Sequence, residues 1–99
     1  MRNETCILIT VWAEGSQKKR KETEVYCRRK SAARTEFYAA YAAGLRPRFI
    51  LEIDPADWEW AWEGTGEGNM PAKVIYRGAE YNIYRDYVTN ESTMELTVG

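Results

Sequence analysis

Alternating apolar and polar positions recur along the chain and predict a β-rich fold. Residues 5–12 (TCILITVW) are rich in β-branched side chains, which are typical of strands. Residues 23–30 place Val25 and Cys27 on one face and polar side chains on the other, as a half-buried strand does. Residues 13–21 contain glycine, serine and the cationic run KKRK and are expected to form a loop. These segments predict a hairpin with a long basic tip.

One short helix is expected over residues 32–43, between the second and third strands. Ser31 is suited to cap its N-terminus, Gly44 to end it in the left-handed conformation, and Pro47 to prevent its continuation. The small apolar face of this segment has the size needed to close one end of a small barrel, and its members are Phe37, Ala40, Tyr41 and Leu45.

Four further strands are expected in the rest of the chain. Residues 49–54 (FILEID) form the third strand, which Asp54 and Pro55 end. A meander follows with a turn at Arg77 and Gly78 and another at residues 89–92, and its strands are residues 72–76, 80–88 and 93–98. Periodicity does not decide which face of these strands is inward. The expected fold is mainly β, a small antiparallel barrel of about six strands in one domain over residues 1–99, with open edges that a neighbouring subunit can cover.

Three tryptophans alternate with other residues after the third strand. In an extended conformation Trp58, Trp60 and Trp62 all point to one side. One interpretation is a strand whose aromatic face closes the core; the other is that three indoles exceed what a small core holds, so at least one is exposed as an anchor for a partner. Residues 64–69 (GTGEGN) then form a loop. This loop is not expected to bind phosphate, because it does not connect a strand to a helix and is not followed by Lys and then Ser or Thr.

The net charge of −1 on these 99 residues conceals a division along the chain. Residues 1–50 carry 11 Lys and Arg against 5 Asp and Glu, whereas residues 51–99 carry 3 against 10. If the fold keeps the halves on different faces, the basic side of one subunit can meet the acidic side of the next in a ring. Alternatively, the halves interleave in the β fold and their charges cancel.

Candidate chemistry is sparse. The chain has no histidine, which removes the commonest acid-base group and metal ligand. Carboxylate pairs such as Glu36 with Glu52 have no accompanying nucleophile, so no enzyme activity, catalytic residue, metal or cofactor is expected. Cys6 and Cys27 are expected to be reduced, buried thiols, with a disulfide possible if their strands pair. The first apolar run is too short for a signal peptide or a membrane span.

The order of motifs resembles one protein family. The run VYCRRKSAARTEFYAAYAAGLRP, the strand FILEID, the hairpin KVIYRGAEYNIYRDYV and the final MELTV are together similar to the phage head closure, or head-tail adaptor (head-tail joining), proteins of tailed phages and prophages. The resemblance covers residues 7–98. The matching positions are Glu36, Phe37, Ala40, Gly44, Pro47, Tyr76, Arg77, Gly78, Tyr81, Tyr84, Arg85 and Tyr87.

This resemblance implies a structural virion protein that catalyses nothing. Such a protein forms a ring between the portal/adaptor complex and the tail, closes the DNA-filled capsid and provides the tail docking surface. Its partners are copies of itself, the portal-side adaptor and the tail-completion proteins, and it encloses phage DNA without sequence-specific binding and without a membrane. It is expected in the host cytoplasm before assembly and at the head-tail interface afterwards. Residues 58–70 and the KKRK run depart from the family pattern, and loops such as these usually carry the partner-specific surface.

The candidate residues fall into two groups. Residues expected at subunit or partner interfaces are Lys18, Lys19, Arg20, Lys21, Arg28, Arg29, Trp58, Trp60, Trp62, Glu63 and Glu67. Residues expected to hold the fold are Phe37, Ala40, Tyr41, Gly44, Pro47 and Gly78. Because a ring around DNA should avoid a strongly positive channel, Glu63 and Glu67 are expected nearer the channel than the KKRK run.

An alternative function is open at this point. A small β-barrel could bind nucleic acid by placing residues 18–21 and 28–30 on phosphates and by stacking Tyr or Trp rings on bases. Against it, the formal charge is acidic overall, and a basic run at a hairpin tip is often only a solvated loop.

Overall fold

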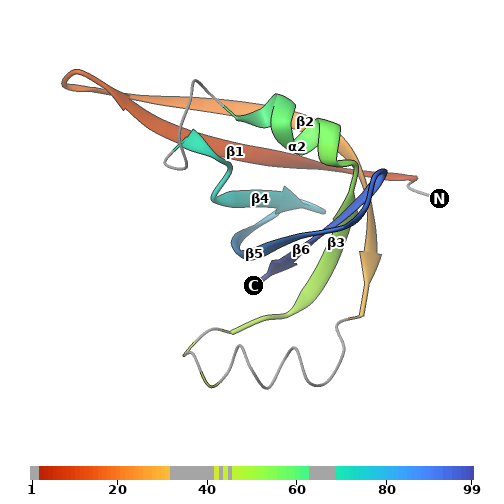
Figure 1. The fold of residues 1–99 in the computed structure, drawn as a ribbon. Coiled ribbons are helices and arrows are strands. Elements are labelled where there is room, and N and C mark those ends of the chain that lie inside the picture. The colour runs from red at the N-terminus through yellow and green to blue at the C-terminus, as the bar shows by residue number, and fades with distance from the viewer. Residues whose placement is uncertain (1–2, 32–41, 43, 45, 63–68) are drawn as a thin grey trace.

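The computed structural model describes residues 3–31, 42, 44, 46–62 and 69–99, and within them the chain is mainly β, as the sequence predicts (Figure 1). Six antiparallel strands close into a barrel in the order β1-β2-β3-β6-β5-β4. The described elements are β1 (Glu4–Glu14), β2 (Gln17–Lys30), β3 (Phe49–Ile53), α2 (Pro55–Ala61), β4 (Lys73–Tyr76), β5 (Ala79–Asn90) and β6 (Thr93–Val98).

The structure describes a helix, α2, that the sequence pattern did not predict. The structure has α2 between β3 and β4, where the sequence pattern indicated a strand or a loop. The helix expected over residues 32–43 falls, apart from the helical Ala42, outside the described residues, and so do Phe37, Ala40 and Tyr41. Gly44 has a φ of +81°, which is the left-handed conformation predicted for it, and Pro47 is buried.

The barrel wall is closed, so the expectation of an open wall with free edges is wrong. Closure occurs because β1 pairs with β2 on one side and, through Ile7 to Ile9, with β4 on the other. β2 pairs with β3 only over Arg28 to Lys30. Within the described residues, the parts of β1 and β2 near their connecting turn therefore form a two-stranded ribbon that extends beyond the barrel (Figure 1).

The basic run lies on a strand, which corrects its assignment to a loop. β1 continues to Glu14 and β2 begins at Gln17, so that only Gly15 and Ser16 form the turn. Gly15 has a φ of +63°, as two-residue hairpin turns require. We call residues 10–14 and 17–21 the basic ribbon. Residues 13–14 and 17–21 of this ribbon lack the apolar alternation that identifies a strand in a sequence, because most of their side chains are exposed.

The core fills the inside of the barrel with alternate side chains from its strands. Its buried strand residues are Cys6, Leu8, Val25, Cys27, Phe49, Leu51, Ile53, Val74, Tyr76, Met94, Leu96 and Val98. The inward face of the closing meander, which periodicity left open, is thus the face of Val74 and Tyr76, and Tyr81 and Ile83 of β5 pack against the same cluster. The Phe49 ring lies 5.4 Å from the Tyr76 ring and meets the Tyr81 ring edge-on at 5.0 Å between centroids.

Replacement of Gly44 by valine is expected to destabilise the fold by about 1–3 kcal/mol, because a β-branched residue is strained at positive φ. A Cβ atom at this position meets no atom within 4 Å, so the loss reports backbone strain alone. Urea unfolding measures it. Gly44→Asn should cost less, since asparagine tolerates this conformation, and Lys19→Ser should change stability by no more than about 0.5 kcal/mol. If Lys19→Ser proved the more damaging, the end assigned to the helix would be wrong.

Candidate interaction surfaces

The basic ribbon displays its cations on both faces. Cross-strand pairs alternate between the faces and are Thr10 with Lys21, Val11 with Arg20, Trp12 with Lys19 and Ala13 with Lys18. Lys19 and Lys21 are partly buried and share a face with Thr10, the side on which α2 packs. Lys18 and Arg20 are exposed on the other face, beside Val11. The ribbon therefore has one face turned toward α2 and one turned to solvent.

Two residues at the base of the ribbon hold the last turn of α2. The hydroxyl of Thr10, which is fully buried, donates a hydrogen bond of 2.7 Å to the carbonyl oxygen of Ala61. The ammonium group of Lys21 donates one of 3.0 Å to the carbonyl oxygen of Trp60 and lies 5.9 Å from the centre of its indole ring. Because the last carbonyls of a helix have no partner within it, these bonds satisfy them. Lys21 thus has an intramolecular role as well as a charge.

The three tryptophans do not lie on a strand, so the interpretation in which all three indoles share one face is wrong. Trp58 and Trp60 lie on different sides of α2: Trp58 is 5% exposed in the core and Trp60 is 76% exposed. Trp62, just after α2, is partly buried against the core. The other interpretation, that at least one indole is exposed, agrees with Trp60.

A sequence signal for α2 was present beside these tryptophans. Asp54 precedes the helix, and its carboxylate accepts a hydrogen bond of 2.8 Å from the backbone N–H of Ala56. Pro55 occupies the first turn, where its missing N–H has no cost, and Asp57 adds negative charge near the N-terminus. The Asp-Pro pair that marks the end of β3 is therefore also the start of a helix.

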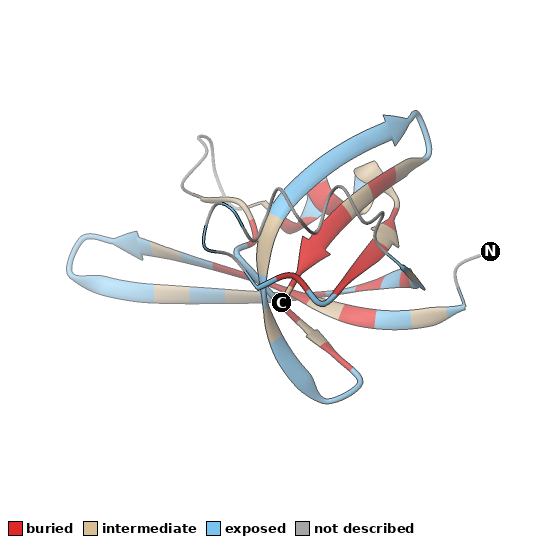
Figure 2. Cartoon of the chain, turned by 90° about the horizontal axis from the view of Figure 1, so that it is seen from below, coloured by how far each residue is buried: buried red, intermediate tan, exposed pale blue. Residues whose placement is uncertain are grey.

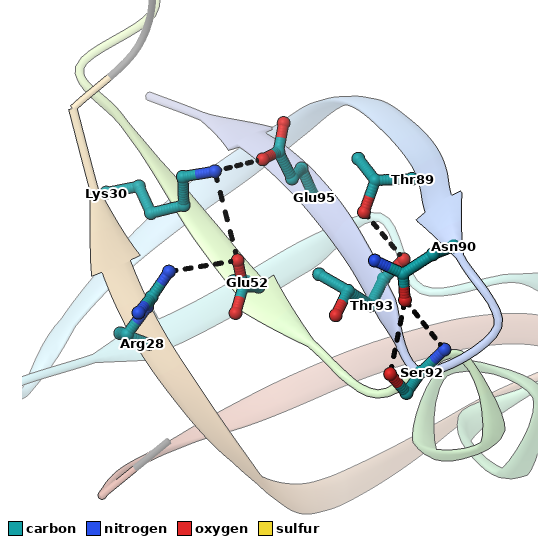
Figure 3. A network of polar contacts seen from close by, with 8 residues as sticks. All are labelled: Arg28, Lys30, Glu52, Thr89, Asn90, Ser92, Thr93 and Glu95. Carbon is teal, nitrogen blue, oxygen red and sulfur yellow. Dashed lines mark hydrogen bonds and ion pairs between the residues drawn. The ribbon is translucent and has the colours of Figure 1, made fainter. Parts of the chain in front are cut away.

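The cations at the end of β2 contact residues of the same chain (Figure 3). Arg28 lies 3.3 Å from the carboxylate of Glu52, and Lys30 contacts both that carboxylate, at 3.8 Å, and that of Glu95. The guanidinium of Arg29 lies 4.5 Å from the centre of the Phe49 ring. Basic residues of the first half of the chain thus meet acidic residues of the second half, and on this face the charges interleave and cancel.

A second ribbon extends from the barrel where β5 and β6 meet. We call residues 86–95 the acidic ribbon, because they include Asp86, Glu91 and Glu95 and no Lys or Arg. β5 continues through Asn90, so the turn is shorter than the predicted residues 89–92. The two ribbons extend to opposite sides of the barrel, and most of their residues are exposed (Figure 2).

The tip of the acidic ribbon is held by its own polar groups. The side-chain oxygen of Asn90 accepts hydrogen bonds from the backbone N–H of Ser92, at 2.9 Å, and from its hydroxyl, at 3.1 Å (Figure 3). The hydroxyl of Thr89 donates to the carbonyl oxygen of Thr93 at 3.0 Å. These bonds favour one shape of the turn. Two apolar residues are also exposed here, although the sequence pattern does not indicate it: Tyr87 is 59% exposed and Val88 is 56% exposed.

Three polar side chains meet beside a surface depression of about 440 Å³ at the start of β1. The carboxylate of Glu4 accepts hydrogen bonds from the hydroxyl of Tyr76 and from the guanidinium of Arg77, whose Nε lies at 3.1 Å. These bonds lower the pKa of Glu4, that from Tyr76 most strongly. Burial, followed by the bond to Glu4, raises the pKa of Tyr76 to about 12. Arg77 and Gly78 have φ values of +51° and +80°, so the cluster adjoins the tight turn predicted there.

Replacement of Glu4 by glutamine is expected to reduce the loss of unfolding free energy that the protein shows as the pH falls. A carboxyl whose pKa is lowered by folding contributes stability above its usual pKa of 4.5 and loses it as the pH falls through the lowered value. Wild-type protein should therefore exceed Glu4→Gln in unfolding free energy at neutral pH, and the difference should shrink in acid. Urea unfolding from neutral pH to below 4.5 measures it. Tyr76→Phe, which removes one donor, should show a smaller change of the same sign; an unaltered Glu4→Gln profile would contradict the assignment.

Cys6 and Cys27 are buried, free thiols on paired strands. Cys6 is aligned with Val25, and Cys27 with Glu4, so the cysteines are diagonal neighbours. A hydrogen bond between the two thiols raises the pKa of Cys6 and lowers that of Cys27. Diagonal neighbours have Cα atoms about 7–8 Å apart, which is at or beyond the span of a disulfide. The pair thus fits a thiol contact in the core better than a cross-link.

Other predicted interface residues stay untested. Glu63 and Glu67 lie outside the described residues, so their position relative to a channel remains a prediction. Within the described part of the chain, no helix has the length and apolar character needed to cross a membrane. A scan against protein-family models finds no match for this sequence, and neither does a search of curated proteins.

Proposed function

We propose that this protein is a structural connector subunit of a tailed phage or prophage particle. In this role it forms a ring between the portal/adaptor complex and the tail, closes the DNA-filled capsid and offers a docking surface to the tail. The proposal is supported by the ordered motifs that resemble head closure proteins and by the small closed barrel that such a protein is expected to have.

The observation that carries the proposal is the pair of unlike ribbons on one barrel. A ring of identical subunits needs two different surfaces on each copy that fit one another. The basic ribbon and the acidic ribbon extend to opposite sides of the barrel, as such surfaces must (Figures 1 and 2). The charges that cancel are those of Arg28, Lys30, Glu52 and Glu95, where β2, β3 and β6 pair. Of these, only Glu95 belongs to a ribbon, so Asp86 and Glu91 still give the acidic ribbon a negative charge.

Retention of packaged DNA tests this function. DNA-filled heads isolated from a lysate that lacks the protein are expected to lose their genome to added nuclease and to accept no tails. Addition of the purified protein should restore both nuclease protection and tail attachment. Heads that keep their DNA and join tails equally well without the protein would contradict the proposal.

The alternative function, nucleic-acid binding, is favoured by one observation. The exposed indole of Trp60 lies beside Lys21, and Trp12 lies across from Lys19, so aromatic and cationic groups are adjacent. Against it, the ammonium group of Lys21 is bonded to a carbonyl, Arg28 is paired with Glu52, and Arg29 covers Phe49. This leaves fewer cations for phosphates than the sequence suggests.

A band-shift assay separates the two functions. Salt-dependent retardation of single-stranded DNA, lost when Lys18, Lys19, Arg20 and Lys21 are all replaced by serine, would favour the nucleic-acid binder. The connector proposal predicts no retardation even at low salt.

A further inference from the structure

We infer that the basic ribbon of one copy of this protein contacts the acidic ribbon of a second copy. This inference rests on the proposed function and names the surfaces that would join neighbouring subunits of the ring. The occupant of each ribbon is thus another copy of the same chain. The contact is head-to-tail, because different surfaces of the two copies meet.

The charges of the two ribbons are opposite and local. The basic ribbon contains four cations and one carboxylate, that of Glu14, whereas the acidic ribbon contains three carboxylates and no cation. One of the three, that of Glu95, is paired with Lys30 of the same chain. Each ribbon has two charged residues that form no ion pair with other described residues. They are Lys18 and Lys19 on the basic ribbon, and Asp86 and Glu91 on the acidic ribbon. A partner of opposite charge can therefore satisfy them, and complementary charge of this kind steers association and fixes its register.

The two ribbons cannot meet within one chain. They lie on opposite sides of the barrel in two perpendicular views, with the tip of the β1–β2 ribbon at the left and that of the β5–β6 ribbon at the right (Figures 1 and 2). The chain is 42 Å long in its longest dimension. Attraction between the ribbons must therefore act between copies, and it orients them head-to-tail.

Each ribbon also carries an exposed apolar side chain beside a charge. Val11, 48% exposed, is aligned with Arg20, and Tyr87, 59% exposed, is aligned with Glu95. Contact between the ribbons would cover both apolar groups. Burial of apolar surface adds attraction that salt does not screen, so the contact combines a charged and an apolar component.

Zero-length cross-linking of the full-length protein tests the contact. A carbodiimide joins an ammonium group to a carboxylate in direct contact, forming an amide with loss of water. In an equal mixture of isotopically light and heavy protein, we expect light-heavy cross-linked peptides that join Lys18 or Lys19 to Asp86 or Glu91. The isotopes distinguish links between copies from links within one. Absence of such peptides from concentrated wild-type protein at low salt would overturn the inference.

Charge reversal provides a matched control. One double variant combines Lys18→Glu with Lys19→Glu, and the other combines Asp86→Lys with Glu91→Lys. Each should lower the yield of cross-linked dimer at least roughly tenfold, since like charges then face each other. The two variants mixed should recover the yield, read as total dimer. Lys73→Glu, an exposed reversal outside both ribbons, should leave it unchanged. A mixture that recovers nothing, from variants with wild-type melting curves, would overturn the inference.

The same proteins distinguish failure of the contact from failure of the proposed function. If wild-type copies cross-link through their ribbons but add nothing to isolated portal/adaptor complexes, the contact stands and the connector function fails. If either double variant occupies those complexes as completely as wild type, the connector function stands and the ribbon contact is wrong.

Discussion

Replacement of Trp58 by alanine is expected to lower the free energy of unfolding by about 3–5 kcal/mol. The Trp58 side chain is 5% exposed and belongs to the core cluster, so its removal takes a large apolar group from the barrel and leaves a cavity. Urea unfolding followed by circular dichroism measures the loss. A partly unfolded variant at room temperature would itself satisfy this expectation.

Trp60 provides the control two residues away. Its side chain is 76% exposed, so Trp60→Ala should change the unfolding free energy by no more than about 0.5 kcal/mol. A strand with all three indoles on one face would instead give two similar losses. Equal destabilisation by the two substitutions would therefore contradict the placement of these residues on α2.

The second large effect is expected inside β1. Leu8 is fully buried in the core, and Leu8→Ala should destabilise the protein by about 2–5 kcal/mol through lost apolar contact and the cavity that remains. The control lies three residues along the same strand, where Val11 is 48% exposed on the opposite face. Val11→Ala should cost no more than about 0.5 kcal/mol. Unfolding curves that reverse this order would mean that the inward face of β1 is assigned wrongly.

Where apolar residues alternate with polar ones, the sequence predicted the strands well. The alternation of Val25 and Cys27 with polar neighbours marks the half of β2 that forms the barrel wall, and the structure buries both residues there. The turn at Arg77 and Gly78 was predictable because glycine readily adopts positive φ. These are positions at which local preference and burial agree.

The strand segment at residues 17–21 could not be recognised in the same way. Lys18 to Lys21 follow one another without an apolar residue, so nothing in their pattern distinguishes a strand from a loop. What makes them a strand is their pairing with residues 10–13, which a linear pattern does not contain. The missed exposure of Tyr87 and Val88 has a similar cause, since apolar residues on a strand usually indicate a buried face.

The helix α2 was missed because two periodicities coincide in a short segment. Tryptophan at every second position fits a strand, yet in a helix the same spacing puts Trp58 and Trp60 on different sides, so that one is buried and the other exposed. The deciding information is at the N-terminus, where Asp54 and Pro55 are a capping residue and a first-turn proline. Capping signals are thus the better guide when an apolar run is this short.

The sequence left open whether the opposite charges of the two halves of the chain cancel or lie on different faces, and both occur in the fold. Where β2, β3 and β6 are neighbours, Lys30 meets Glu52 and Glu95, so the opposite charges of the two halves cancel. At the ribbons they stay apart, because each ribbon is built from neighbouring segments of one half. The charge that remains is therefore concentrated on two sides of the barrel, where we propose that subunits meet.

Electron microscopy of isolated portal/adaptor complexes, with and without the purified protein, tests the proposed connector function most directly. We predict an additional ring of density on the tail-side end of the complex when the protein is present, with barrels joined side to side. Complexes that look identical with and without a saturating amount of the protein would contradict that function.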